Sequence, residues 1–251
     1  MTSTTLSRSA GSLTAWLFPV IWLMLLMGLI LGMPQLETLL RAIEPSSREV
    51  LYSRDSLLTL LISHILVVGV ASLLAIIIGV GASILVTRPW GRDFLPLVSQ
   101  LASIGQTFPP VAVLALAVPW LGFGTVPTIM ALLLYGLLPI VRNTLVGIQG
   151  IEPAVLEAAR GMGMSPRQRL WRVELPLAAP VIVAGIRTSI TINIATAAIG
   201  STIGAKTLGD PIIAGIVNGN TAYILQGAVL IALLALVVDS SLERLGHLFS
   251  R

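Results

Sequence analysis

Long uncharged, apolar runs alternate with short polar segments along this chain. Four runs, at residues 9–36, 56–87, 188–205 and 211–238, contain 28, 32, 18 and 28 residues without a charged side chain. About 20 apolar residues cross the hydrocarbon core of a bilayer as a helix, so each of these runs predicts one transmembrane helix. A fifth run, residues 94–141, has 48 uncharged residues and is too long for a single span.

The glycines and proline of residues 121–127 (LGFGTVP) divide this longest run into two spans. The pattern therefore predicts an all-α integral membrane protein, in which residues 1–251 form a single transmembrane domain. Six transmembrane helices are expected at residues 13–33, 57–86, 97–119, 126–148, 186–205 and 222–243.

Composition supports a membrane protein. Hydrophobic residues make up 55% of the chain and charged residues 10%, with a mean hydropathy of +0.95, whereas soluble domains carry about 25% charged residues. The chain has no cysteine, which excludes disulfides, a thiol nucleophile and Cys-ligated metal sites. Small-residue cleavage signals are missing near residues 32–34, so an uncleaved first span is expected rather than a signal peptide.

Basic residues predict the orientation of the spans. Six spans place both termini on one side, together with the turn at residues 87–96 and the segment between the fourth and fifth spans. When the segment between the fourth and fifth spans is taken to end at Arg187, that side holds 11 of the 15 Lys and Arg residues. The positive-inside rule makes it cytoplasmic, so we expect a multi-pass protein of the inner membrane with both termini in the cytoplasm. The net charge of +4 then indicates topology rather than nucleic-acid binding.

Two spans carry features expected of a transport pathway. The third is broken at residues 108–110 (FPP) and again at Pro119, and such breaks persist at membrane depth only where protein or a water-filled cavity satisfies the freed backbone groups. The fifth has seven polar residues among 18, although each hydroxyl could instead bond to its own helix. The expected pathway residues are Gln106, Phe108, Pro109, Pro110, Ser189, Asn193 and Thr196.

Groups that could carry catalysis are sparse. There are two histidines and no metal-binding spacing. Ser83 resembles an intramembrane nucleophile, but His64 lies 19 residues earlier on the same predicted helix, about 28 Å away. Residues 200–207 nearly match a phosphate-binding loop, but Ala205 replaces the glycine before the lysine. We therefore expect no enzyme activity, metal or cofactor.

Asp239 and Glu243 are spaced as i and i+4 in the last predicted span. They lie at its predicted cytoplasmic end beside Arg244, which favours an interfacial ion pair. A proton relay is the alternative for two carboxylates at this depth.

The densest charge cluster is residues 156–176 (LEAARGMGMSPRQRLWRVELP). Gly161 and Gly163 interrupt a good helix former, and Ser165–Pro166 is typical of an N-cap followed by a first-turn proline. We predict a cytoplasmic helix-turn-helix, within residues 149–185, on which a partner docks. Binding of anionic lipid headgroups by its arginines is the alternative.

The order of residues in this segment resembles the EAA motif of permease subunits of bacterial ABC importers, Glu-Ala-Ala-x3-Gly-x9-Ile-x-Leu-Pro, with Val173 standing for Ile. The resemblance implies a coupling helix that inserts into a cleft on an ATPase subunit. Glu157 would cap or orient its first helix, Gly163 would make the turn, and Pro176 would fix the entry of the fifth span. The implied coupling residues are Glu157, Ala158, Ala159, Gly161, Gly163, Met164, Ser165, Leu175 and Pro176.

Residues 86–89, 105–112 and 207–212 are similar to the glycine betaine/choline/carnitine branch of this family. The branch implies a MetI-like permease fold without cofactors and import of an osmoprotectant delivered by a periplasmic or extracellular binding protein. It also implies a cytoplasmic ATPase dimer and a second permease subunit, with a heterodimer favoured over a homodimer. Import of another small solute such as an amino acid, a stand-alone channel or secondary transporter, and a membrane enzyme are the alternatives.

Overall fold

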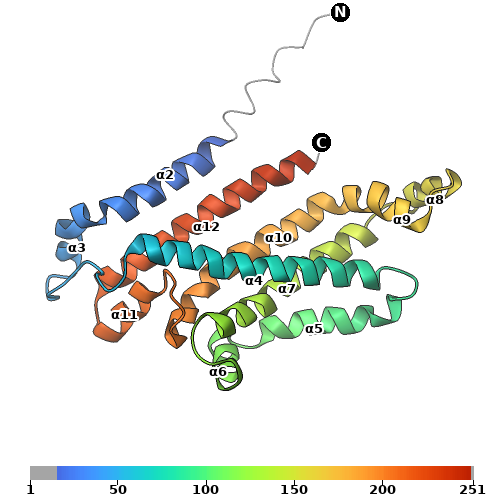
Figure 1. The fold of residues 1–251 in the computed structure, drawn as a ribbon. Helices are drawn as coiled ribbons and strands as arrows, with labels where there is room; N and C mark the ends of the chain where they lie inside the picture. Colours follow the sequence, from blue (N-terminus) through green and yellow to red (C-terminus); the bar gives the residue numbers. More distant parts are fainter. Residues whose placement is uncertain (1–15, 250–251) are drawn as a thin grey trace, which may run out of the picture.

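The computed structural model describes residues 16–249, and within them the chain forms helices and no strand (Figure 1). The all-α prediction is confirmed. The first three residues of the predicted first span, 13–15, lie outside the described part. The helices are α2 (Leu17–Gly32), η2 (Met33–Leu36), α3 (Glu37–Ile43), α4 (Leu57–Val86), η3 (Arg92–Phe94), α5 (Leu95–Thr107), α6 (Pro110–Leu121), α7 (Thr125–Gln149), α8 (Pro153–Gly161), α9 (Pro166–Arg169), η4 (Leu170–Glu174), α10 (Leu175–Ala197), η5 (Ala198–Ile203), α11 (Asp210–Asn218) and α12 (Thr221–Phe249).

Five helical stretches are long and apolar enough to cross a membrane: Leu17–Ile43, Leu57–Val86, Thr125–Gln149, Pro166–Ile203 and Thr221–Gly246. A sixth is the pair Arg92–Thr107 and Pro110–Leu121, bent by 100° at the predicted break. Consecutive prolines cause the bend, because they remove two backbone donors and force residue 108 into an extended conformation. The second predicted break is wrong: α6 continues through Pro119 and ends two residues later.

The predicted start of the fifth span at residue 186 is also wrong, because α10 begins at Leu175. Pro176 lies in the first turn of α10, where its missing N–H has no intrahelical partner to lose. Arg187, expected at the cytoplasmic edge of the span, is the thirteenth residue of α10. The Arg187 charge does not mark the start of the helix, because Asp239 of α12 neutralises it and α10 runs past it.

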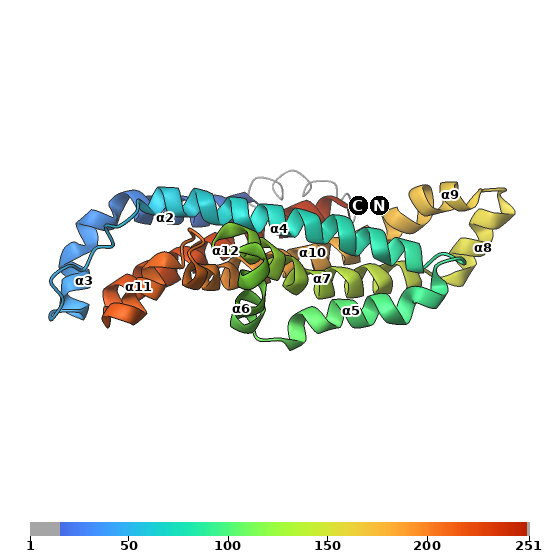
Figure 2. The same ribbon diagram turned by 60° about the horizontal axis from the view of Figure 1, so that its bottom comes forward.

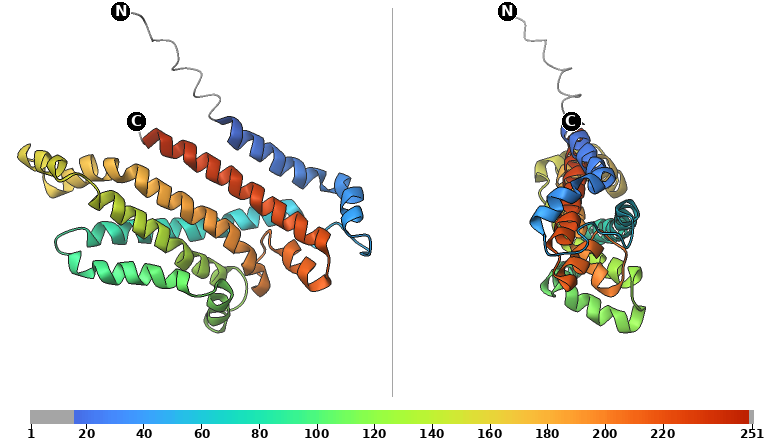
Figure 3. Two further views of the ribbon diagram at one scale, coloured as in Figure 1. Left: turned by 180° about the vertical axis from the view of Figure 1, so that it is seen from behind. Right: turned by 90° about the vertical axis from the view of Figure 1, so that its left-hand side faces the viewer.

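The helices form a flat arrangement (Figures 2 and 3). α10 packs between α7 and α12, α2 covers α12, and α5 covers α7. α4 crosses α7 and α10 on one side, and the view from behind shows α10 and α12 in front of it (Figure 3, left). Close approach depends on small residues: Ala71 and Ala75 are fully buried, and a Cβ on Gly136 would come within 2.7 Å of the Ser189 hydroxyl.

At the end of the molecule opposite α8 and α9, loops are fixed by polar side chains (Figure 1). Gln226 of α12 donates to the Val50 carbonyl at 2.7 Å and accepts from the Tyr52 amide at 3.2 Å. Lys206 pairs with Asp55 at 2.7 Å, and this carboxylate raises the pKa of the lysine. Burial raises the pKa of Asp210 at the start of α11 above its ordinary value of 3.8.

Candidate functional site

Residues 150–174 form a projection at one end of the molecule, which we call the α8–α9 segment (Figures 1 and 2). α8 ends at Gly161, and Gly163 has φ of +77°, which a glycine adopts without strain. Ser165 caps α9 in a reciprocal capping box: its hydroxyl accepts from the Gln168 amide at 3.3 Å, and its amide donates to Oε1 of Gln168 at 2.9 Å. The predicted turn and N-cap are confirmed.

Glu157 does not cap a helix. It is the fifth residue of α8, and the N-cap position is occupied by Glu152. The prediction that Glu157 caps this helix is wrong. α8 begins at Pro153, one turn before the start of the polar cluster. Glu157 is instead exposed beside Ala158, while Ala159 is buried.

Two large apolar side chains on this segment were not picked out from the sequence. Met162 and Trp171 are 70% and 64% exposed, and exposed apolar groups rimmed by polar residues are typical of protein interaction surfaces. The sequence contains a signal for Met162 and Trp171, since both apolar residues interrupt a polar stretch. Met164 is half-buried, and Gly161, Gly163 and Ser165 are exposed.

A buried carboxylate ties the α8–α9 segment to the turn that follows α4. Glu174 is only 4% exposed. Its Oε2 accepts from Nη2 of Arg88 at 2.5 Å, and its Oε1 accepts from Nε of Arg169 at 2.9 Å. We call this contact the Glu174 bridge. Its partner Arg88 is 86 residues away in sequence, so no local pattern indicates it.

A cavity of about 310 Å³ lies beside the Glu174 bridge, against the turn after α4. Four guanidinium groups and one carboxylate line it, which gives it an excess of positive charge: Arg88, Arg92, Arg160, Arg169 and Glu174. Such a cavity attracts anionic groups. The arginines of this region therefore have both a structural and an electrostatic effect.

The residues around the bend of the third span contact α7. The Tyr135 hydroxyl donates to the Phe108 carbonyl, and Nε2 of Gln106 donates to the Tyr135 carbonyl at 2.9 Å. The first bond satisfies the Phe108 carbonyl at the break. The second satisfies the Tyr135 carbonyl, which has no partner within α7 because Pro139, four residues later, lacks an N–H. Phe108 and Pro109 are exposed and Pro110 is half-buried.

The predicted pathway residues of the fifth span have different environments. Ser189 and Asn193 are fully buried between helices: Ser189 donates to the Gly136 carbonyl at 2.9 Å, and Nδ2 of Asn193 donates to Oγ of Ser72 at 3.1 Å. Thr196 is half-buried. Their place on a transport pathway stays a prediction.

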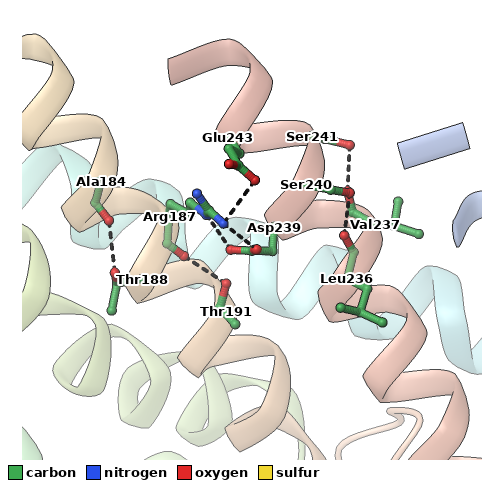
Figure 4. Close-up of polar contacts among 10 residues, drawn as sticks. All are labelled: Ala184, Arg187, Thr188, Thr191, Leu236, Val237, Asp239, Ser240, Ser241 and Glu243. Atoms are coloured by element: carbon green, nitrogen blue, oxygen red, sulfur yellow. Dashed lines mark hydrogen bonds and ion pairs between the residues drawn. The ribbon is translucent and has the colours of Figure 1, made fainter. Parts of the chain in front are cut away.

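The exposed face of α10 carries Thr188 and the half-buried Thr191. Their hydroxyls donate to carbonyls of the same helix, at Ala184 and Arg187, each at 3.0 Å (Figure 4). For these two threonines the alternative of bonding within their own helix is confirmed.

Asp239 and Glu243 form an ion cluster with Arg187 (Figure 4). Nη2 of Arg187 lies 2.6 Å from Oδ2 of Asp239 and 3.4 Å from Oε2 of Glu243. The expected ion pairing of these carboxylates is confirmed, but the cation is Arg187 rather than Arg244. The cationic partner comes from α10, 52 residues away from Asp239, and sequence spacing gives no sign of it.

The groups considered for catalysis are structural. Nδ1 of the buried His64 accepts from the Leu208 amide at 3.2 Å, so Nε2 carries the proton and donates to the Ile194 carbonyl at 3.1 Å. Ser83 donates to the Gly79 carbonyl at 2.7 Å. Within residues 16–246, whose side chains are described, no group of three or more His, Asp or Glu side chains is placed to hold a metal ion.

Comparison with known proteins agrees with this architecture. Residues 75–251 match the family model described as binding-protein-dependent transport system inner membrane component. The chain is 41% identical over 187 residues to the osmoprotectant import permease protein OsmY of Salmonella typhimurium, covering 74% of this chain and 79% of the relative. It is 42% identical over 176 residues to the choline transport system permease protein OpuBB of Bacillus subtilis, covering 70% and 80%.

The fold also resembles a solved structure. A chain of the MetNI methionine ABC transporter, in an inward-facing conformation, superimposes with a TM-score of 0.68 at 22% identity, covering 78% of this chain and 96% of the other. The likeness shows a MetI-like fold. The family match over residues 75–251 and the 41–42% identical permeases show that the chain belongs to the binding-protein-dependent transport system inner membrane components.

Proposed function

We propose that this chain is the transmembrane subunit of an ATP-driven importer and forms part of the pathway for a quaternary-amine osmoprotectant. The observation that carries the proposal is the projecting α8–α9 segment, which presents Glu157 and Ala158 next to a turn at Gly163. This surface has the shape and exposure of a docking element. The family description and the permease names of the relatives support the same function.

The geometry suggests how a movement of the docked ATPase would be transmitted to the transport pathway. Pro166–Ile203 is one unbroken helical stretch that runs from α9 through the π-helical turn η4 into α10. A push on α9 would therefore tilt α10 as a lever. The Glu174 bridge would carry the same displacement to the turn after α4, because Arg88 belongs to that turn.

The partners follow from this mechanism. A cytoplasmic ATPase dimer would dock on the α8–α9 segment and hydrolyse ATP, so this subunit itself is not catalytic. A soluble binding protein would deliver the solute to the opposite face. The chain would cross the cytoplasmic membrane several times, with both termini and the α8–α9 segment in the cytoplasm and residues 1–251 as one domain.

A second, related permease completes the pathway in this proposal. Two similar proteins of Bacillus subtilis, OpuCB and OpuCD, both carry the name glycine betaine/carnitine/choline transport system permease protein. The shared name of these two different permeases supports a heterodimer over a homodimer for this chain.

The substrate class rests on the named relatives, which include osmoprotectant, choline and carnitine permeases. Uptake tests it directly. The chain, its partner permease, ATPase and binding protein are expressed in a host that lacks osmoprotectant uptake, and radiolabelled choline, glycine betaine and carnitine are supplied in high salt. We expect uptake of at least one of them and restored growth. Uptake of an amino acid instead, with none of the three, would overturn the assignment.

A further inference from the structure

The Arg187–Asp239–Glu243 cluster lies within two candidate spans, midway along α10 and toward the C-terminal end of α12. Arg187 is 12 residues from the start of α10 and 10 from its end, about 18 Å and about 15 Å along the helix. Asp239 and Glu243 lie on α12, seven and three residues before the end of the candidate span Thr221–Gly246. Charged groups within a span are costly in lipid, and they normally face a bundle interior or a water-filled cavity.

The cluster is not enclosed by the bundle. The side chains of Arg187 and Asp239 are each 33% exposed, and that of Glu243 is 41% exposed. In Figure 4 they lie in front of α4, on the side of α10 and α12 that α4 does not cover. The cost of the charges disfavours lipid around their open part. In the proposed assembly this part faces the water-filled pathway that the chain forms with the second permease.

Two grooves flank the guanidinium group. One, of about 390 Å³, runs along Thr188, Thr191 and Ile192 beside Asp239. The other, of about 300 Å³, runs past Pro180 and Gly246 beside Glu243. Arg187 lines both. Each groove reaches the lower limit of small-molecule pockets, which is about 300 Å³.

The charges of the cluster do not cancel. One guanidinium and two carboxylates leave a formal charge of −1, and a single carboxylate would have been enough to neutralise Arg187. Asp239 already contacts Arg187 through both oxygens, whereas Glu243 makes only one contact at 3.4 Å. Arg244 lines neither groove. Glu243 is therefore the carboxylate left to attract a second cation.

We propose that this cluster is a cation-selective contact point on the wall of the transport pathway, where Glu243 attracts the quaternary ammonium group of the solute and Arg187 limits how tightly it is held. The inference rests on the proposed function for its substrate class. A quaternary ammonium has no hydrogen-bond donor, so its attraction to a carboxylate is purely electrostatic. The guanidinium keeps the local charge at −1 rather than −2, and this favours release.

The absence of native cysteine allows a direct test. Ala184 is exposed and lines both grooves, so Ala184→Cys is made in the complete transporter and treated with two thiosulfonate reagents, one carrying a trimethylammonium group and one a sulfonate. Each rate is divided by the rate of the same reagent with a small free thiol. We expect the cationic reagent to be favoured by about tenfold at Ala184→Cys, in the nucleotide-free or the ATP-bound state. Adding Glu243→Gln should abolish that preference, and Glu243→Asp should keep it.

Three further cysteines control the experiment. Ser53→Cys lies on an exposed loop and should react with both reagents, whereas Leu73→Cys, on an exposed apolar surface of α4, should react with neither. Ser240→Cys lies on α12 and points away from Arg187 (Figure 4), so it should show no change with Glu243→Gln.

The outcomes separate this inference from the proposed function. No reaction at Ala184→Cys in either state, or reaction without a charge preference, would overturn the inference even if choline uptake is intact. Failure of uptake together with a preference that depends on Glu243 would overturn the proposed substrate, while the cation-selective site would stand.

Discussion

The Arg88 guanidinium and the Glu174 carboxylate, 86 residues apart in sequence, meet at 2.5 Å beneath the α8–α9 segment. Because Glu174 also holds Arg169, one buried carboxylate connects the proposed docking element to the turn after α4. Glu174→Gln removes the charge and leaves two guanidinium groups unpaired. We expect a loss of about 2 kcal/mol or more in the free energy of unfolding and weaker coupling of ATP hydrolysis to uptake.

Thermal unfolding in detergent and the ratio of ATP hydrolysed to solute imported would measure both effects. Glu152→Gln is the matched control, since this exposed carboxylate on the same segment makes no described ion pair. Equal stability and equal coupling ratio in Glu174→Gln and the control would contradict a role for the Glu174 bridge.

Gly136 sets the distance between α7 and α10. A Cβ there would lie 2.7 Å from Oγ of Ser189 and 3.0 Å from Nδ2 of Asn193. We expect Gly136→Ala to destabilise the bundle by about 1–3 kcal/mol, as overpacking does. Gly81→Ala on α4, where a Cβ meets nothing within 4 Å, should be neutral or stabilising. Thermal melts of the two variants test this, and a similar effect of both would show that the contact is not tight.

The hydrogen bonds of the His64 ring predict the effect of replacing this residue. His64→Leu keeps an apolar side chain in the core but leaves the Leu208 amide without its acceptor. An unsatisfied buried amide costs about 1–3 kcal/mol, so we expect a lower melting temperature with the helical content retained. A melting temperature equal to that of the native protein would mean that the Leu208 amide has another acceptor.

Stability at the end that carries α11 should depend on pH through Asp210. Burial raises the pKa of this carboxyl in the folded state above its ordinary value of 3.8, so the folded state holds its proton to higher pH than the unfolded state does. This contribution to stability therefore falls as pH rises from 3.8 through the folded-state pKa, and stays reduced above it.

Asp210→Asn removes that dependence. We subtract the melting temperature of the native protein from that of Asp210→Asn at each pH. We expect this difference to increase between about pH 4 and pH 7. Asp93→Asn, on an exposed turn at the other end, serves as control. A difference in melting temperature that shrinks with rising pH would contradict a raised pKa of Asp210 in the folded state.

Local chemistry in the sequence predicted much of the fold. α4 has the predicted bounds 57–86, because an uninterrupted apolar run follows a Ser56 N-cap that accepts from the Thr59 amide. The turn at Gly163 and the cap at Ser165 were equally predictable, since both depend only on neighbouring residues. Proline and glycine positions likewise located the bend and the division of the longest run.

Long-range pairing was not predictable in the same way. Arg187 was taken as the edge of a span because its neutralising partner Asp239 lies on another helix. In the sequence, Glu174 is one of several charges in a polar cluster. The structure shows that it is buried and pairs with Arg88. In each case a single sequence contains the charge but not the distance to its partner.

Docking of an ATPase on the α8–α9 segment is the central claim. A Cβ on Gly163 would meet no atom within 4 Å, but the φ of +77° strains any side chain there, so Gly163→Asp both adds a charge and perturbs the turn. Glu157 is exposed on the neighbouring helix α8. The Glu157→Lys, Gly163→Asp double variant therefore changes the charge and the turn geometry of the docking surface, and Glu49→Lys, at the opposite end, controls for charge reversal.

The most direct measurement is co-purification of the P-loop ATPase with the native chain, the double variant and the control from the same membranes. We predict normal membrane insertion of all three, ATPase retained by the native chain and by Glu49→Lys, and ATPase and uptake lost in the double variant. Full ATPase association and unchanged uptake in the double variant would contradict the account.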